Sequence, residues 1–206
     1  YTAAAVNKNC PNAKFIGPQG VVDEWIEWGI PEEKTVVVKP NDEVTVGATT
    51  IKALESFDRT ELVTEDDPSV KLAGKMPQDM SKIAVNYLIQ TSGGNLYDAG
   101  DSHMSNTFTK HGNENKIDVS LCAYGDNPRG ITDKLDDSQV LRMAEDLNTQ
   151  VVIPMHYDIW DNFYADPKDI ISLWNLKKNR LQYKFKPYIL QVGGQFNFPQ
   201  DKDKFE

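Results

Sequence analysis

The sequence predicts a mixed α/β fold. In the first half, strand candidates follow one another closely, separated by turn residues, as in hairpins. In the second half, strand patterns alternate with helix patterns, as in βαβ units. The hydrophobic fraction of 39% in 206 residues is sufficient for a core, and the length fits one large domain or one and a half small ones.

The first half is expected to contain short helices followed by hairpins. Residues 3–7 resemble the end of a helix, and residues 21–28 carry apolar side chains at helical spacing before Gly29 and Pro31. The expected strands are 14–16, 35–39, 43–46, 50–54 and 84–90, and a turn at 92–95 leads into a strand at 96–97. The polar segment 56–82 contains proline and is expected to be a loop at a site or an interface.

The second half is expected to alternate strands with helices. The expected strands are 119–123, 151–154 and 186–192. One helix is expected to begin at Asp136 or Ser138, and another at Asp166-Pro167. Three tryptophans are expected to lie in the core: Trp25, Trp28 and Trp174.

Charge and cysteine content restrict the partners and the compartment. The net charge of −9 disfavours nonspecific attraction to nucleic acid or to an anionic membrane. No apolar run approaches the roughly 18–20 residues of a membrane span. Cys10 and Cys122 lie far apart, and Cys122 is expected to be a buried structural thiol in an apolar run. This cysteine usage fits a reducing cytoplasm.

Two strand candidates end at residues that bind metals. The first runs into Gly100-Asp101, and the second, 151–155, runs into His156. If both ends lie on one rim of a sheet, a carboxylate oxygen and an imidazole nitrogen come together there, as in open catalytic metal sites. From the residues alone, Asp101 could also be a turn or capping residue, and His156 a core histidine hydrogen-bonded to the backbone.

Several blocks of sequence carry a family resemblance. They are Ser56-Phe57-Asp58-Arg59-Thr60, Gly100-Asp101-Ser102-His103, His111-Gly112-Asn113-Glu114, residues 124–134, His156-Tyr157-Asp158-Ile159-Trp160, Phe185-Lys186-Pro187 and Gln191-Val192-Gly193-Gly194. In this order they resemble the L-ascorbate-6-phosphate lactonase branch of the metallo-β-lactamase-fold hydrolases, along essentially the whole chain. The resemblance implies the four-layer αββα sandwich, with residues 1–206 as the incomplete C-terminal portion of one domain.

One departure from this family pattern concerns the metal ligands. The family signature His-x-His-x-Asp-His is absent, and the chain opens at Tyr1-Thr2-Ala3. We interpret the sequence as a fragment that has lost its front part. A structural fragment without catalytic competence is therefore an alternative to an active enzyme.

The resemblance implies a metal-dependent carboxylic ester hydrolase of ascorbate catabolism. It would open the lactone ring of L-ascorbate 6-phosphate to give 3-keto-L-gulonate 6-phosphate, with metal-activated water as the nucleophile. The implied cofactor is a divalent metal, Mn²⁺ or alternatively Zn²⁺. The implied partners are a small phosphorylated sugar lactone and further copies of the same chain, with no nucleic acid and no membrane. A phosphodiesterase or ribonuclease on the same fold is the alternative activity.

The resemblance also assigns roles to individual residues. Asp101 would bridge two metals and His156 would be a terminal ligand. Asp58 would be a further ligand, or would pair with Arg59 or cap a turn. The candidate substrate-binding residues are Asn127, Arg129, Lys134, His103 and Tyr124.

For each of these residues a structural role is the alternative. Arg and Lys suit a phosphate group, but Arg129 could instead pair with Asp126 or Asp133. His103 could orient Asp101, and Tyr124 could merely pack. His111 is expected at a helix end and need not be a ligand.

Overall fold

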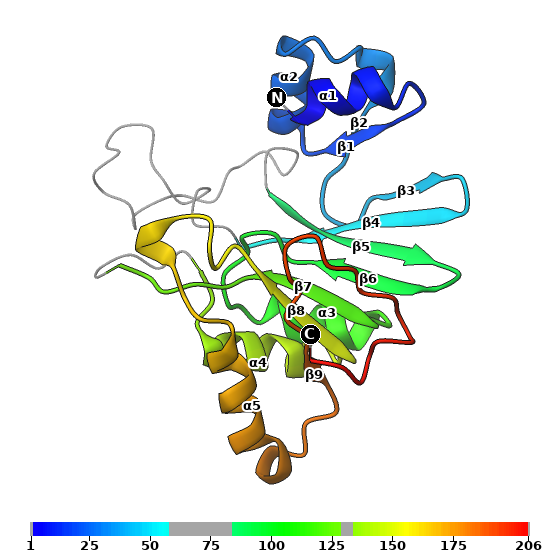
Figure 1. Ribbon diagram of the computed structural model, residues 1–206. Coiled ribbons are helices and arrows are strands. Elements are labelled where there is room, and N and C mark those ends of the chain that lie inside the picture. The colour runs from blue at the N-terminus through cyan, green and yellow to red at the C-terminus, as the bar shows by residue number, and fades with distance from the viewer. Residues whose placement is uncertain (1, 58–83, 129–133, 206) are drawn as a thin grey trace.

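The computed structural model describes residues 2–57, 84–128 and 134–205. Within these residues the elements form one larger mixed sheet, a small two-stranded sheet and several helices (Figure 1). The predicted site residues Asp58 and Arg129 lie outside the described residues, as does most of the predicted loop 56–82.

The larger sheet has seven strands in the described part of the chain, and their spatial order follows the sequence. They are β3 (Glu43–Val46), β4 (Thr49–Glu55), β5 (Val85–Thr91), β6 (Gly94–Asp98), β7 (Val119–Ala123), β8 (Val151–Met155) and β9 (Lys186–Pro187). Pairing is antiparallel from β3 to β6 and parallel from β6 to β9. The prediction of hairpins first and strand–helix alternation later is therefore confirmed.

The N-terminal elements lie beyond β3 and β4 (Figure 1). They are α1 (Thr2–Asn9), β1 (Phe15–Gly17), α2 (Gln19–Glu27), a 3₁₀ turn at Glu32–Lys34 and β2 (Thr35–Val37), with β1 and β2 paired in parallel. Trp25 packs edge-on against Phe15 at a ring distance of 5.6 Å. The prediction that Trp28 lies in the core is wrong, because α2 ends at Glu27 and the Trp28 side chain, just past the last turn, is 56% exposed.

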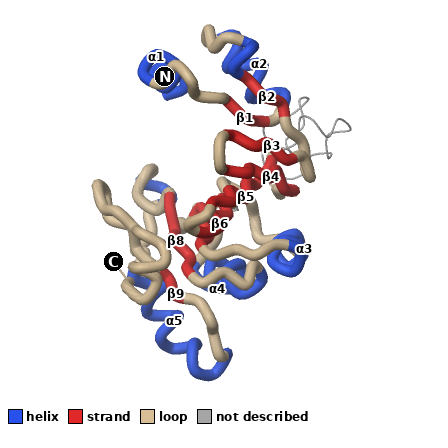
Figure 2. Tube along the Cα trace, turned by 90° about the vertical axis from the view of Figure 1, so that its right-hand side faces the viewer, coloured by secondary structure: helices blue, strands red, loops and turns tan. Residues whose placement is uncertain are grey.

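Three helices pack on one face of the larger sheet (Figure 2). They are α3 (Thr107–Glu114), α4 (Asp137–Asp146) and α5 (Lys168–Leu181). Asp136 caps α4: its carboxylate accepts from the Gln139 backbone N–H, and the Gln139 side chain accepts in return from the Asp136 N–H. Trp174 of α5 is buried as predicted, and its indole N–H donates to the Phe185 carbonyl at 2.9 Å.

Alternation along the strands divides the apolar residues between the two faces. Tyr97, Cys122 and Val152 point toward the helices, where Cys122 is a buried free thiol as predicted. The opposite face carries a second apolar cluster built on Val119 and Ile153. The described residues thus provide one helical layer and one sheet of the expected αββα arrangement.

The last strand is shorter than predicted. The sequence predicts a strand over 186–192, but β9 contains only Lys186–Pro187. The backbone N–H of Ile189 donates to the Phe205 carbonyl at 2.7 Å, so the chain leaves the β8 edge to pair with the C-terminal segment. No helix in the described residues is long and apolar enough to cross a membrane.

Candidate metal site

Asp101 and His156 come together at the carboxyl ends of the parallel strands. Asp101 follows β6 and His156 follows β8, with β7 between them. Although they are 55 positions apart, the Asp101 Oδ1 and His156 Nδ1 atoms lie 3.1 Å apart. In open α/β sheets, ligands bind outside the carboxyl ends of the strands, so these two side chains occupy the expected place for a site.

The backbone turns sharply at both strand ends. Gly100 has φ +51°, and His156 has φ +70°, which is unusual for a residue with a side chain. The Asp98 carboxylate accepts from the Gly100 N–H at 2.9 Å and supports the first turn. A left-handed histidine at a strand end is a strained position of the kind found at functional sites, and here it accompanies the contact with Asp101.

Lys134 is the third side chain of the site. Its Nζ donates to Asp101 Oδ1 at 2.5 Å, although the two residues are 33 positions apart. The Lys134 side chain is only 3% exposed, whereas that of Asp101 is 41% exposed. The loop after β7 therefore buries a cation directly beside the carboxylate.

These neighbours hold Asp101 in its ionised form. The hydrogen bond from His156, followed by the hydrogen bond and positive charge of Lys134, keeps the pKa of the Asp101 carboxyl well below its usual range. An ionised carboxylate can only accept hydrogen bonds, so Nδ1 of His156 is the donor. In the neutral ring, the lone pair of Nε2 is then left for another partner, the arrangement seen in metal-binding histidines.

The donor types at this site suit a divalent metal, and the described residues supply part of a ligand set. A carboxylate oxygen and an imidazole nitrogen are both common ligands of Zn²⁺ and Mn²⁺. In residues 2–57, 84–128 and 134–205, however, no three His, Cys, Asp or Glu side chains gather where they could hold one ion. Asp101 and His156 thus fit as two ligands of a site that needs at least one more.

The structure also describes three further predicted site residues, His103, Asn127 and Tyr124. His103 is buried, and its backbone N–H donates to the Phe57 carbonyl at 2.7 Å. The Asn127 amide hydrogen-bonds both backbone groups of Lys134, at 2.8 and 2.9 Å. The Tyr124 hydroxyl donates to the Asp166 carbonyl at 3.1 Å, and burial raises its pKa. Contact of these side chains with substrate stays a prediction.

Trp160 is a site residue that the sequence did not identify. Its ring lies 6.1 Å from the His156 ring, and its centroid is 5.2 Å from the Lys134 Nζ. Despite these contacts, the side chain is 47% exposed. The available signal was a large aromatic residue four positions after a candidate metal-binding histidine.

His111 lies away from this site, in the core. It is on α3 as expected, and its side chain is 1% exposed. Its Nδ1 is 2.8 Å from the Tyr97 hydroxyl, and burial lowers its pKa to about 4. The His111 side chain is therefore enclosed in the core, whereas the His156 side chain is 25% exposed.

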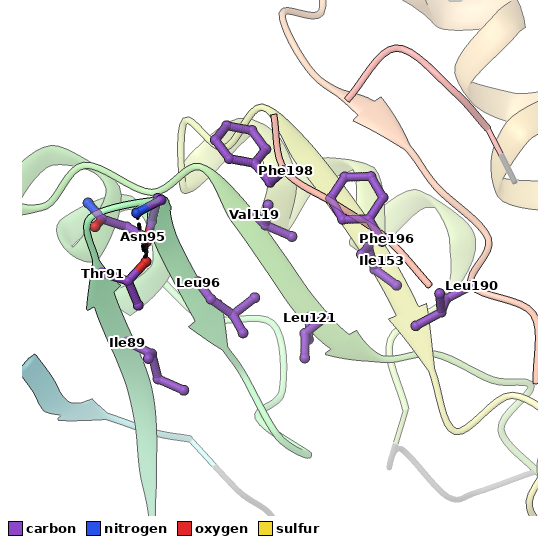
Figure 3. A pocket seen from close by; sticks show the side chains of 12 residues that line it. Ile89, Thr91, Asn95, Leu96, Val119, Leu121, Ile153, Leu190, Phe196 and Phe198 are labelled. Carbon is purple, nitrogen blue, oxygen red and sulfur yellow. Dashed lines mark hydrogen bonds between the residues drawn. The ribbon is translucent and has the colours of Figure 1, made fainter. Parts of the chain in front are cut away.

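An apolar groove of about 430 Å³ lies on the sheet face that the helices do not cover. Figure 3 shows its lining, which includes Leu96, Val119, Leu121, Ile153, Phe196 and Phe198. None of the lining residues belongs to the Asp101, Lys134 and His156 cluster. The groove is thus separate from the candidate metal site.

The sequence is closely similar to curated proteins that are named probable lactonases. No family model matches it. A protein named probable L-ascorbate-6-phosphate lactonase UlaG from Salmonella heidelberg (strain SL476) is 58% identical over 205 residues, which cover 99% of this chain and 58% of the relative. The homologue of that name from Salmonella choleraesuis (strain SC-B67) gives the same values. The chain thus spans well under two thirds of the length of these relatives.

Solved structures with much lower identity share the fold. Igni18, a metallo hydrolase from Ignicoccus hospitalis, aligns with a TM-score of 0.66 at 16% identity, over 92% of this chain and 70% of that one. Isothiocyanate hydrolase from Delia radicum gut bacteria aligns with a TM-score of 0.64 at 15% identity, over 93% and 69%. The metallo-β-lactamase fold protein YhfI from Bacillus subtilis gives 0.56 at 12% identity, over 92% and 66%. This chain therefore has the metallo-β-lactamase fold and, over the compared residues, is a sequence relative of the L-ascorbate-6-phosphate lactonases.

Proposed function

We propose that the protein containing this chain is a metal-dependent lactonase that opens the ring of L-ascorbate 6-phosphate. The observation that carries this proposal is the meeting of Asp101 and His156 at the carboxyl ends of β6 and β8. The 58% identity to a curated protein named probable L-ascorbate-6-phosphate lactonase supports the choice of substrate. The reaction would belong to ascorbate catabolism, in a cytoplasmic protein made of identical subunits.

In this proposal Asp101 and His156 hold the metal, with Asp58 as a further ligand. Manganese is our preferred ion, because two of the three proposed ligands are carboxylates, and Zn²⁺ is the alternative. When bound, a divalent ion supplies a nucleophilic water at neutral pH and stabilises negative charge on the carbonyl oxygen. The part of this chain is to present the donors: Asp101 stays ionised, and its hydrogen bond orients the His156 ring.

The phosphate of the substrate needs a local positive charge, because the chain as a whole carries −9. We propose that Arg129 provides this charge through charge-assisted hydrogen bonds. The remaining predicted contacts to substrate are Asn127, Lys134, His103 and Tyr124. Trp160 packs edge-on against both His156 and Phe163 and supports one side of the proposed metal position.

The test uses protein made from the complete reading frame that contains these 206 residues. Lactone hydrolysis and bound metal are measured for wild type, Asp101→Asn and His156→Gln. Both variants are expected to remain folded and to lose most of the activity and the metal. The matched control is Asp158→Asn, the same chemical change at an exposed residue close to His156, and it should behave as wild type. Near-normal turnover of either site variant would refute the proposed ligand role.

A further inference from the structure

The position of Lys134 is fixed by hydrogen bonds to its own backbone and to that of the next residue. Its N–H and carbonyl are both bonded by the Asn127 side chain, at 2.9 and 2.8 Å. The next residue, Leu135, donates to the Ala123 carbonyl at 3.0 Å, so the loop returns to the end of β7. A Cβ on Gly125 would lie 2.6 Å from the Phe163 carbonyl and 3.3 Å from the Lys134 Cγ, so only glycine leaves room for this packing.

The ammonium group of Lys134 is placed against one particular oxygen. Its Nζ contacts Asp101 Oδ1 at 2.5 Å and lies 5.2 Å from the centroid of the Trp160 ring. A buried ammonium needs a compensating charge, and Asp101 provides it. The face of an indole within about 6 Å also attracts a cation, so the ring offers the ammonium a second favourable contact.

The same oxygen also accepts from His156 Nδ1 at 3.1 Å. A carboxylate oxygen has about two lone-pair sites, and these two donors occupy both on Oδ1. A metal ion bound to Oδ1 at about 2.0–2.2 Å would have to replace one of them. The ammonium would moreover lie within a few ångströms of a divalent cation, where the repulsion between like charges is strong.

We propose that Lys134 and a divalent metal ion compete for the Oδ1 atom of Asp101, so that the lysine holds the carboxylate in place without metal and lowers the metal affinity of the site. The inference rests on the proposed role of Asp101 and His156 as metal ligands and adds a residue that sets their affinity. Lys134 is thereby a positioning residue. With a metal on Oδ1 the ammonium would leave that oxygen, and the Trp160 ring, 5.2 Å from the Nζ atom, would remain a favourable contact.

The experiment measures the affinity for Zn²⁺ and for Mn²⁺ by competition with a chromogenic chelator, on the complete protein. Lys134→Met removes the charge at nearly constant length and is expected to bind metal about ten-fold more tightly, equivalent to about 1.4 kcal/mol. Lys134→Gln is the second neutral variant if the methionine variant fails to fold. Lys134→Arg keeps the charge and should keep the wild-type affinity. Lys110→Met removes a lysine paired with Glu55 outside the site and should have no effect.

The direction in which metal affinity changes in the neutral Lys134 variants separates competition from a purely structural role. A lysine that only supports the loop would leave metal affinity unchanged or weaken it when removed, and either result in a folded neutral variant would overturn the competition. Asp101→Asn separates this failure from failure of the proposed function. If Asp101→Asn weakens metal binding but the neutral Lys134 variants do not tighten it, only the competition is wrong. If Asp101→Asn leaves metal binding unchanged, the ligand assignment and the competition fail together.

Discussion

The Tyr97 hydroxyl and the His111 Nδ1 atom lie 2.8 Å apart in the core between β6 and α3. The Asn86 side-chain N–H donates to the same hydroxyl at 2.8 Å, so the hydroxyl proton is directed to His111. Nδ1 is therefore the acceptor, and the neutral ring carries its proton on Nε2. The Asn86 amide also donates to the Glu55 carbonyl, which ties this network to the end of β4.

Removing the Tyr97 hydroxyl should destabilise the fold. Tyr97→Phe leaves the His111 Nδ1 atom without its donor in a site where water cannot replace it. The expected loss in the free energy of unfolding is about 1–3 kcal/mol. Urea denaturation measures this loss. Tyr164→Phe, at a residue 60% exposed, is the matched control and should change stability by less than about 0.5 kcal/mol. Equal stability of the two variants would show that the network contributes little.

Stability should fall in mild acid because of His111. Its pKa is about 4 in the folded protein against 6.5 in the unfolded chain, because burial disfavours the charged ring. The folded state then binds fewer protons, so stability is constant above about pH 6.5 and falls as the pH drops toward 4. Between pH 7.5 and 5 the expected loss is about 1–2 kcal/mol.

His111→Gln should remove most of this pH dependence, as measured by urea denaturation at both pH values. The Asp101 carboxyl has a pKa below its ordinary value of 3.8, so its contribution is present above that pH and is lost only below it. The two groups therefore titrate in separate windows. An unchanged slope between pH 7.5 and 5 in His111→Gln would mean that another group titrates there.

Gly112 is expected to tolerate no side chain. A Cβ there would lie 2.7 Å from the Leu147 Cα atom, because α3 approaches the end of α4 closely at this residue. Gly112→Ala should cost about 1–3 kcal/mol by forcing the backbones apart. Gly20→Ala makes the same change within helix α2, where a Cβ meets nothing within 4 Å, and should be neutral or stabilising by up to about 1 kcal/mol. Thermal unfolding of the two variants side by side gives the comparison.

The proposed phosphate contact of Arg129 predicts a change that depends on the substrate. Arg129→Ala should raise the Michaelis constant for the phosphorylated lactone about ten-fold or more, as expected for the loss of one charge-assisted hydrogen bond. The constant for the unphosphorylated analogue should change little. Steady-state kinetics on both substrates gives the answer. An equal loss on both would indicate that Arg129 supports its loop instead.

Local patterns in the sequence were sufficient to predict most elements of this fold. The strand 119–123 is β7 with the same limits, and the capping residue Asp136 lies immediately before α4. These features depend on neighbours along the chain, such as the Asp136–Gln139 capping box. Trp28 was misplaced for the same reason, since helical spacing does not show where a helix ends against its surroundings.

The pairing of Asp101 with His156 could be anticipated from the two strand ends. The family resemblance gave Lys134 as a candidate substrate-binding residue, but its contact with Asp101 could not be anticipated. Lys134 is a loop residue whose neighbours Asp133 and Asp136 offer equally plausible local partners. Its burial depends on the return of the loop to β7 and on the space beside Gly125. Such contacts depend on the three-dimensional path of a loop, which the spacing of apolar residues along the sequence does not reveal.

Because β7 lies between β6 and β8, the candidate site also marks a stage of folding. A nascent chain that ends at residue 150 contains Asp101 and Lys134 but lacks His156 and the strand that carries it. Contacts so distant in sequence form only after the loops between them have closed, and closing those loops costs entropy before the contacts can stabilise the fold. The Asp101–His156 contact should therefore appear only after α3, which connects β6 to β7, and α4, which connects β7 to β8, have packed on the sheet. A probe of that contact would report on the assembly of the whole parallel half of the sheet.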